Sequence, residues 1–318
     1  PGQEIRFGRP TLKPEVRSQI SARMSRPAAP RALTGRTRVV GVIGYPVEHS
    51  LSPAMHNAEF ERLGLDWVYV PFPVRPENVE TALRGLAALG VAGVNVTIPH
   101  KQAVLPVLDE VTPEARIIGA VNTIRFDENG RMSGHNTDAP GWVEDIQQDI
   151  LLAGSTVAVL GAGGASRALC VAAALAGTKS ICIFNRTTET ARLMSESLQT
   201  EFPETVFDWA PLDSGGSRDK FLNYEIVVNA TSVGMATNPG SPVPVEWLNE
   251  NQYVYDTIYT PAETELLRAA RQRGCATRNG TGMLARQGAL AFEIWTGQKA
   301  DPERMESVIR RHLAGERG

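Results

Sequence analysis

The sequence predicts an α/β protein of two domains, each built on a mainly parallel sheet. Its 318 residues exceed the length that one hydrophobic core usually serves. From residue 38 onward, apolar runs of strand length alternate with patterns of helical period, the order that produces parallel sheets. Near residue 155 a second series of this kind begins, and it includes a glycine-rich turn.

Three strands and two helices are expected in the first unit. Ser52 is predicted to be the N-cap of the first helix, Pro53 lies in its first turn and Gly64 ends it. Because of its β-α-β-α-β order, the segments HSLS and PHK lie at the carboxyl edge of the sheet. The expected elements are strands 38–46, 67–74 and 93–99 and helices 52–64 and 76–90.

A hairpin and a connecting helix separate the two units. The hairpin turns at Asn129-Gly130, a pair that suits a tight two-residue loop, and the helix is expected over 140–151. A strand, a glycine-rich turn with its helix, and a further strand follow over 155–187. These signals predict a flexible extension at 1–37, rich in Arg, Pro and Ser, then domains at 38–138 and 139–281, and C-terminal helices at 282–318.

Composition and charge exclude several classes of function. A net charge of −3 gives no basis for a nucleic-acid partner, and no run approaches the roughly 20 apolar residues that span a bilayer. The five histidines lack zinc spacing, so no metal site is expected. Three scattered cysteines, expected to be reduced, and the lack of an apolar signal core predict a cytoplasmic protein. A monomer and a homodimer both remain open.

The segment GAGGAS indicates a dinucleotide site. It follows a short apolar strand and opens an alanine-rich helix, which is the context that this motif requires. Gly161 allows the tight turn, and Gly163 with Gly164 lets backbone N–H groups approach a pyrophosphate. Ser166 replaces the third glycine of the fingerprint.

The end of the next strand favours NADP over NAD. An NAD site usually has an acidic residue there, whereas this chain has Asn185-Arg186-Thr187. A guanidinium suits a 2′-phosphate, and charge-assisted hydrogen bonds of about 1.5–3 kcal/mol correspond to a roughly ten- to hundredfold preference. A solvated arginine at the strand end is the plainer alternative.

Polar residues interrupt the apolar strand GVNVTIP. Strand alternation places Asn95 and Thr97 on one face, and Pro99 cannot continue a central ladder. Lys101 therefore lies at the carboxyl end of the strand. An isolated lysine in such a place is more often a solvated charge, so a catalytic interpretation depends on other motifs.

Several separated motifs, in order, make the chain resemble the shikimate dehydrogenases over roughly residues 40 to 312. They are HSLSPAMHN (49–57), NVTIPHK (95–101), GAVNT (119–123), NTD (136–138), GAGGASRA (161–168), NRT (185–187), NATSVGM (229–235) and MLARQGALAFEIWTG (283–297). The resemblance implies an NADP-dependent interconversion of 3-dehydroshikimate and shikimate in aromatic amino-acid biosynthesis. It also implies a substrate-binding domain at 38–138, a Rossmann-like NADP-binding domain at 139–281, and final helices, 283–296 and 302–313, that return to the first domain.

The same resemblance implies roles for individual residues. Lys101 and Asp138 match the catalytic pair of the family, Ser50 and Ser52 the residues that hold the substrate carboxylate, and Met283 one that lies near the nicotinamide. The remaining implied substrate contacts are Asn95, Thr97, Asn122, Tyr259 and Gln287. The remaining implied cofactor contacts are Gly161, Ala162, Gly163, Gly164, Ala165, Asn185, Arg186, Thr187, Thr231 and Gly280.

Two departures from the family pattern affect these expectations. Ala139-Pro140 follows Asp138 where relatives commonly have glycine, and Thr190 stands where a second basic residue is common; Arg192 or Lys179 are alternatives for that second charge. The alternative functions are a quinate/shikimate or aminoshikimate dehydrogenase with relaxed cofactor choice, a folate dehydrogenase of similar design, and a non-catalytic NADPH-binding module.

Overall fold

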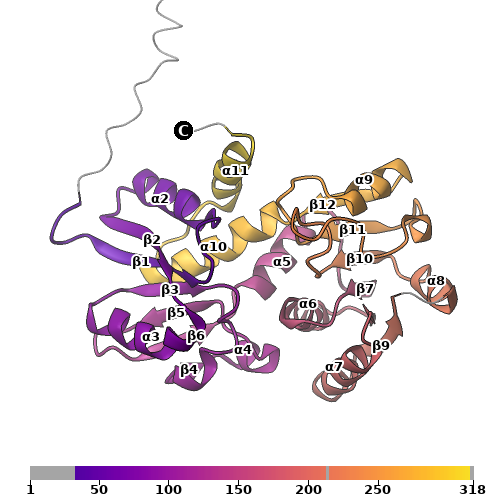
Figure 1. Cartoon of the computed structure of the whole chain (residues 1–318), viewed down its shortest axis with the longest axis horizontal. Coiled ribbons are helices and arrows are strands. Elements are labelled where there is room, and N and C mark those ends of the chain that lie inside the picture. The colour runs from indigo at the N-terminus through magenta and orange to yellow at the C-terminus, as the bar shows by residue number, and fades with distance from the viewer. Residues whose placement is uncertain (1–32, 213–214, 316–318) are drawn as a thin grey trace, which may run out of the picture. The chain divides into compact units, whose positions relative to one another are not determined.

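Two β-sheets with helices packed against them make up the part of the chain that the computed structural model describes, residues 33–212 and 215–315 (Figure 1). The two-domain α/β fold predicted from the sequence is confirmed. The predicted extension at 1–37 lies outside the described residues except for its last five. None of the described helices is both long and apolar enough to cross a membrane.

The first sheet is mainly parallel, with one antiparallel hairpin inserted. Its strand order is β2-β1-β3-β5-β6-β4, and β1 pairs in parallel with both β2 and β3. β5 runs antiparallel to both β3 and β6, and the tight turn at Gly130 reverses the chain between β5 and β6. The strands are β1 (Arg38–Gly44), β2 (Trp67–Pro73), β3 (Gly93–Val96), β4 (Glu110–Val111), β5 (Thr123–Phe126) and β6 (Met132–His135), and the helices are α2 (Ser52–Arg62), α3 (Val79–Ala88) and α4 (Pro113–Ile118).

The second sheet is parallel throughout. Its order is β12-β11-β10-β7-β8-β9, so the strand order reverses between β7 and β10. Dinucleotides bind at such a reversal, at the carboxyl ends of the strands. The elements are β7 (Thr156–Leu160), α6 (Gly164–Leu175), β8 (Ser180–Asn185), α7 (Thr188–Glu201), β9 (Val206–Pro211), α8 (Gly215–Phe221), β10 (Ile226–Asn229), β11 (Tyr253–Asp256), α9 (Glu265–Gln272) and β12 (Ala276–Asn279).

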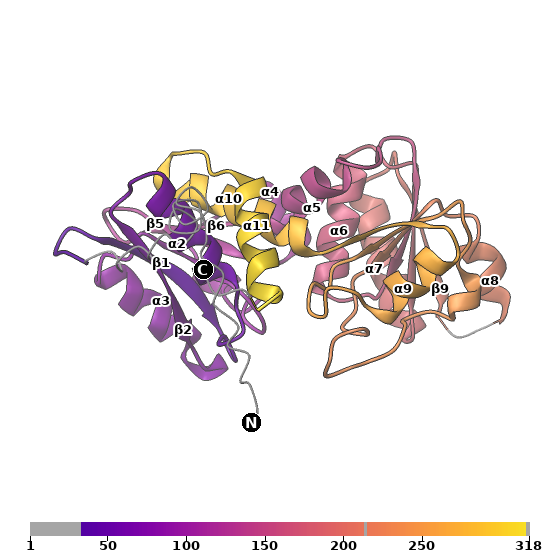
Figure 2. The ribbon, with the colours of Figure 1, turned by 90° about the horizontal axis from the view of Figure 1, so that it is seen from above.

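Three helices join the two sheets. α5 (Asp138–Ile146) connects them along the chain, and α10 (Thr281–Thr296) packs against both α5 and α2. α11 (Pro302–Leu313) then packs against α2 and α10, as Figure 2 shows. Trp295 of α10 donates its indole N–H to the Ile124 carbonyl at 3.0 Å, which fixes the end of α10 on the first sheet. The C-terminal chain therefore returns to the first sheet, as predicted.

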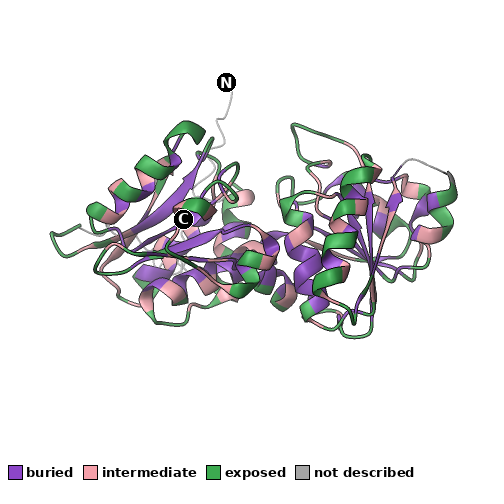
Figure 3. Ribbon diagram, turned by 90° about the horizontal axis from the view of Figure 1, so that it is seen from below, coloured by how far each residue is buried: buried purple, intermediate pink, exposed green. Residues whose placement is uncertain are grey.

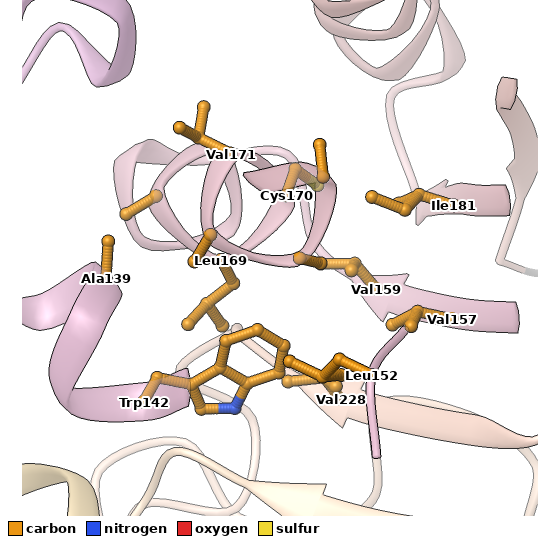
Figure 4. Packing of buried hydrophobic residues seen from close by; sticks show 14 of the residues in the cluster. Ala139, Trp142, Leu152, Val157, Val159, Leu169, Cys170, Val171, Ile181 and Val228 are labelled. Carbon is orange, nitrogen blue, oxygen red and sulfur yellow. The ribbon is translucent and has the colours of Figure 1, made fainter. Parts of the chain in front are cut away.

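The hydrophobic core lies on the strands and the inward faces of the helices, and the outward faces of the helices are exposed (Figure 3). Trp142 of α5 is fully buried and packs with Leu169 of α6 and Val228 of the second sheet (Figure 4). This cluster anchors the helix that begins with Asp138.

Several element boundaries differ from the sequence prediction: β1 ends at Gly44 and β3 at Val96, α3 begins at Val79 and ends at Ala88, and α10 begins at Thr281. The starts of α2 and α5 also differ. The N-cap of α2 is Leu51, and Ser52 is already the first helical residue; its backbone N–H donates to Ser50 Oγ at 3.3 Å. The Ser50 hydroxyl thus satisfies one of the first N–H groups of α2, which have no partner within the helix. α5 begins at Asp138 rather than 140 and ends at Ile146, after which the chain continues in short turns.

An aromatic cluster joins α2, β2 and α10. His56 is fully buried, and its ring stacks on that of Tyr69 with 4.4 Å between the centroids and 3° between the planes. Neither ring nitrogen of His56 has a hydrogen-bond partner among the described residues. Burial lowers the pKa of His56 to about 3, so the ring is neutral in the folded protein near neutral pH.

Replacing Gly93 by alanine should destabilise the fold. An alanine Cβ there would lie 2.2 Å from Trp295 Nε1 and 2.6 Å from the Ile124 carbonyl, so the Trp295 contact must shift. We expect a loss of about 1–3 kcal/mol in the free energy of unfolding, measured by urea denaturation. Gly85→Ala is the matched control, since nothing lies within 4 Å of its Cβ position and helix propensity favours alanine. Equal stabilities of the two variants would contradict this account of α10.

Acid should weaken the fold through His56. Between its ordinary pKa of 6.5 and its folded value of about 3, the unfolded chain binds one more proton at this residue than the folded chain. Stability therefore falls as pH decreases through this window, by up to about 1.4 kcal/mol per pH unit. His56→Phe should reduce the difference in unfolding free energy between pH 7 and pH 5, whereas His312→Asn, at an exposed position, should not. An unchanged difference in His56→Phe would exclude this linkage.

Candidate active site

An ion pair between Lys101 and Asp138 lies at the centre of the site. Lys101 Nζ donates to Asp138 Oδ2 at 2.7 Å, and the two side chains are 34% and 16% exposed. The pair is therefore sheltered but still reachable from the cleft. Lys101 and Asp138, which are 37 positions apart in the chain, are thus brought into contact by the fold.

The turn after β3 holds Lys101 through its neighbours. His100 is buried, and its Nε2 lies 2.7 Å from the Val74 carbonyl; since a carbonyl only accepts, this nitrogen carries the proton. The Lys101 carbonyl accepts a bond of 2.8 Å from the Val121 N–H. The histidine of the PHK segment is thus structural, and the backbone of Lys101 is fixed while its side chain projects to the cleft.

The loop before α5 holds Asp138 in the same way. Asn122 Oδ1 accepts the Thr137 N–H at 2.7 Å, and Asn136 Oδ1 accepts the Ala139 N–H at 3.1 Å. Pro140 fits in the first turn of α5, where a backbone N–H has no partner within the helix. The Ala139-Pro140 pair, which stands where relatives commonly have glycine, therefore does not turn the Asp138 carboxylate away from Lys101.

A cavity of about 470 Å³ is lined by all seven of the predicted substrate contacts. The predicted residues that line it are Ser50, Ser52, Asn95, Thr97, Lys101, Asn122, Asp138, Tyr259, Gly280, Met283 and Gln287. Residues that the sequence analysis did not select also line it, among them Tyr45, His49, Thr257 and Met235. His49 and Met235 lie in motifs quoted above, and Thr257 lies two residues before Tyr259. Their closeness in sequence to predicted site residues was therefore the signal that could have identified them.

The polar groups of this cavity are largely paired with one another. Asn122 Nδ2 donates to Thr137 Oγ1 at 2.9 Å and lies 3.4 Å from Gln287 Oε1, while Gln287 Nε2 donates to the Leu284 carbonyl at 2.8 Å. Burial raises the pKa of Tyr259, so its phenol is a hydrogen-bond donor at neutral pH. The cavity therefore offers hydroxyl and carboxamide groups in fixed orientations, which suits a small polar ligand.

A second cavity, of about 420 Å³, joins the first at the ion pair. Lys101, Asp138 and Met283 line both, and the second is also lined by Gly163 of the glycine turn and by Gly164, Ala165 and Ala168 at the start of α6. Gly161 has φ +104°, a conformation that favours glycine, and a Cβ on Gly163 would meet nothing within 4 Å. No side chain caps the N-terminus of α6, so its N–H groups and this open space fit a dinucleotide pyrophosphate.

Six predicted cofactor residues do not line either cavity: Gly161, Ala162, Asn185, Arg186, Thr187 and Thr231. Thr231 lies behind the turn, where its Cγ2 would be 2.9 Å from a Cβ on Gly161. Asn185 Nδ2 donates to the Thr187 carbonyl at 2.9 Å and shapes the bend after β8. Arg186 is exposed at that bend and has no ion pair with a described residue.

The two alternatives for a second basic group do not fit. Arg192 is already bound to Glu189 at 2.7 Å and to Glu196 at 2.6 Å. Lys179 precedes β8, so it lies at the amino end of the strand, six residues and roughly 20 Å from Asn185 at the other end. Of these three basic residues, Arg186 is the one that follows the carboxyl end of β8 and has no ion pair with a described residue.

A larger cavity, of about 700 Å³, lies beside α5 and contains none of the predicted site residues. Its lining combines apolar side chains with Glu114, Glu144 and Glu293. Burial and the nearby Glu293 raise the pKa of Glu144, against the opposing effect of Arg286. Because it lacks the ion pair and the glycine turn, we place the site in the other two cavities.

Two family models match the chain. The model described as the shikimate dehydrogenase substrate binding domain matches residues 42–124, which include Ser50, Ser52, Asn95, Thr97, Lys101 and Asn122. The model described as the shikimate 5'-dehydrogenase C-terminal domain matches residues 280–310, which include Met283 and Gln287.

Relatives match over nearly their whole length. Shikimate dehydrogenase (NADP(+)) of Geobacter sp. (strain M21) is 45% identical over 284 residues, 89% of this chain and 98% of the relative. The shikimate 5-dehydrogenase structure from Thermus thermophilus with NADP(H) and shikimate has a TM-score of 0.78 and 40% identity, covering 86% of this chain and 99% of that one. The quinate dehydrogenase structure from Corynebacterium glutamicum with NAD also has a TM-score of 0.78, at 34% identity, covering 86% and 99%. This chain belongs to the shikimate dehydrogenase family.

Proposed function

We propose that this chain catalyses the reversible, NADPH-dependent reduction of 3-dehydroshikimate to shikimate, a step of aromatic amino-acid (chorismate) biosynthesis. One observation carries the proposal. The Lys101–Asp138 pair lies where a cavity of fixed hydroxyl and carboxamide groups meets the cavity at the glycine turn. A ketone between them would have a proton donor on one side and the cofactor site on the other. The 45% identity to an NADP-dependent relative supports the same reaction.

The two domains divide the binding of the two reactants. The first sheet, residues 38–138, with the C-terminal helices from residue 282, binds the substrate, and residues 139–281 bind NADP. The turn from Gly161 to Ala165 and the N-terminus of α6 hold the pyrophosphate, and Gly280 and Met283 lie near the nicotinamide ring. NADPH, when bound, supplies the hydride that reduces the ketone carbon.

The substrate contacts follow from which groups can donate. Ser50, Ser52 and the phenol of Tyr259 lie in the same cavity and hold the carboxylate of the substrate. Asn95, Thr97, Asn122 and Gln287 contact the ring hydroxyls. Hydrogen bonds within the protein fix the side chains of Asn95, Asn122 and Gln287.

Lys101 moves the proton. Its ammonium donates to the carbonyl oxygen as that oxygen gains negative charge, so a ketone, one hydride and one proton give a secondary alcohol. Asp138, at 2.7 Å, holds the ammonium in place. In the reverse direction the neutral amine accepts the hydroxyl proton, so the same pair serves both directions. No imine is needed for hydride reduction of a ketone, so we do not assign a Schiff base to Lys101.

Arg186 sets the preference for NADP. It is the basic side chain left at the carboxyl end of β8, and it is exposed with no ion pair to a described residue, so its guanidinium is available to a 2′-phosphate. Asn185 and Thr187 shape the bend that carries it, and Thr231 supports the glycine turn.

The second candidate is a quinate-using enzyme with relaxed cofactor choice, favoured by the likeness to a quinate dehydrogenase with NAD. Turnover measured on shikimate and quinate, each with NADP and NAD, separates the two. No turnover on any of these pairs, with NADPH still bound, would instead indicate a non-catalytic binding module.

The cellular compartment and the oligomeric state of the protein stay predictions. The three cysteines are buried and unpaired, which agrees with a cytoplasmic protein. Sedimentation of the full chain distinguishes the monomer from the homodimer.

Lys101→Ala should remove most of the turnover. A positioned acid typically contributes ~10²- to 10⁴-fold, so we expect a decrease of that size in kcat for shikimate oxidation, with little change in the Kd for NADPH. Lys179→Ala is the control, since Lys179 lies at the far end of β8. Near-normal kcat in Lys101→Ala would defeat the proton-transfer role, and an adduct on Lys101 trapped by borohydride would establish the imine instead.

Arg186→Asp should reverse or abolish the cofactor preference. Loss of the charge-assisted bonds and repulsion of the 2′-phosphate should lower kcat/KM for NADP relative to NAD by about ten- to hundredfold. Arg192→Ala is the matched control, because that guanidinium already binds two glutamates and should leave the ratio unchanged. If Arg192→Ala changed the ratio more than Arg186→Asp, the assignment would be reversed.

A further inference from the structure

Tyr69 lies directly behind the substrate cavity without lining it. It belongs to β2, is 2% exposed, and donates its hydroxyl to Asn95 Oδ1 at 2.8 Å. Asn95 lines the cavity from β3. The phenol therefore contacts, from the core side, a carboxamide that faces the ligand.

The hydrogen bonds of Asn95 determine which way its carboxamide points. Its Nδ2 lies 3.2 Å from the Asn122 carbonyl and 3.0 Å from Thr123 Oγ1. A backbone carbonyl only accepts, so the amide nitrogen must face that side and Oδ1 must face Tyr69. Both protons of the nitrogen are then engaged, and one lone pair of Oδ1 accepts from the phenol. The group of Asn95 that remains for a ligand is therefore the second lone pair of Oδ1, a hydrogen-bond acceptor.

Tyr69 is held in place both at its backbone and at the face of its ring. Asn57 accepts the Tyr69 N–H at 2.8 Å and donates to its carbonyl at 2.9 Å. The face stacks on the neutral ring of His56 at 4.4 Å. The phenol is thus a fixed point from which a hydrogen bond can orient a neighbour.

Burial raises the pKa of Tyr69 well above its ordinary value. The phenol therefore keeps its proton and donates it to Asn95 Oδ1.

We propose that Tyr69 is a positioning residue for substrate binding, which fixes Asn95 as a hydrogen-bond acceptor toward a ring hydroxyl of the substrate. This inference rests on the proposed function. It assigns the phenol no part in proton or hydride transfer. Its loss should therefore weaken binding of the hydroxy acid much more than it changes the chemical step or the binding of NADP.

Tyr69→Phe tests the inference, since it removes the hydroxyl and keeps the ring that stacks on His56. A single hydrogen bond corresponds to about a three- to tenfold change, so we expect KM and Kd for shikimate to rise by that factor. The KM for NADP should stay at the wild-type value and kcat should change less than twofold. Unchanged KM and Kd for shikimate, or an equal rise in the KM for NADP, would overturn the inference.

A double-mutant cycle with Asn95→Ala tests whether Tyr69 acts through Asn95. In the Asn95→Ala background, Tyr69→Phe should raise KM for shikimate no further, because the group it orients is gone. If the increases in KM of the two single variants instead multiplied in the double variant, the two residues would act independently. That result would also overturn the inference.

Tyr253→Phe is the matched control. It removes the hydroxyl of another buried tyrosine, which donates to Asp149 at 2.7 Å in the second domain. It should lower the thermal midpoint without changing KM for shikimate, so a shared loss of stability cannot explain a selective effect of Tyr69→Phe. If Tyr69→Phe does not fold, Thr123→Val releases the same carboxamide from its other side and should raise KM for shikimate; an unchanged KM would count against the inference. A wild-type chain inactive on shikimate would instead refute the proposed function.

Discussion

The segment from Ala120 to Thr123 holds both members of the ion pair in place. Its Val121 N–H donates to the Lys101 carbonyl at 2.8 Å, and Asn122 Oδ1 accepts the Thr137 N–H at 2.7 Å, next to Asp138. Asn136 Nδ2 also donates to the Ala120 carbonyl at 3.0 Å. One short stretch thus binds the turn that carries the lysine and the loop that carries the acid. Hydrogen bonds of the backbone and of the Asn122 and Asn136 carboxamides therefore set the distance between Lys101 and Asp138, in addition to the ion pair itself.

The far end of α5 is fixed by a buried charge network. Asp145 is fully buried and accepts from Arg286 at 3.0 Å, from Arg278 at 2.9 Å and from the Tyr255 hydroxyl at 2.7 Å. A buried carboxylate is tolerated only when it is paired in this way. The partners come from α10, β12 and β11, so the helix that begins with Asp138 is bound to the second sheet and to the helix that carries Gln287.

The fold could be predicted well from the sequence because the spacing of apolar residues along a strand or helix follows which of its faces is buried. Alternating apolar runs identified β1, β2, β3, β7 and β8, and the glycine turn gave the β7–α6 junction, since both signals are local. The start of α2 was placed at the wrong residue because Ser52 and Ser50 are equally good capping residues, and only the backbone geometry at Leu51 decides between them. Arg192 looked available because the sequence does not show that Glu189 and Glu196 occupy its guanidinium.

The candidate site was predicted from motifs, and what the motifs omitted came from the opposite side of strands or from loops. Tyr69 sits in WVYVPFPV as an ordinary core aromatic, and nothing in that pattern shows that its hydroxyl meets Asn95. Tyr45, which none of the quoted motifs includes, lines the cavity from a loop, whose course depends on tertiary contacts. Local patterns therefore give the residue types of the site, while long-range pairing gives their orientation.

Orientation also bears on which ligands the site can select. Carboxamides that were free to flip could offer a donor or an acceptor to any ligand, and would discriminate little between similar acids. Here the Asn122 carbonyl, Thr123 and Tyr69 fix Asn95, and Thr137 fixes Asn122, so each presents one polarity to the cavity. A ligand lacking the matching hydroxyl would leave a buried lone pair unpaired, which costs about 1–3 kcal/mol. Rejection of poorly matched acids then follows from bonds that the protein makes to itself before any ligand arrives.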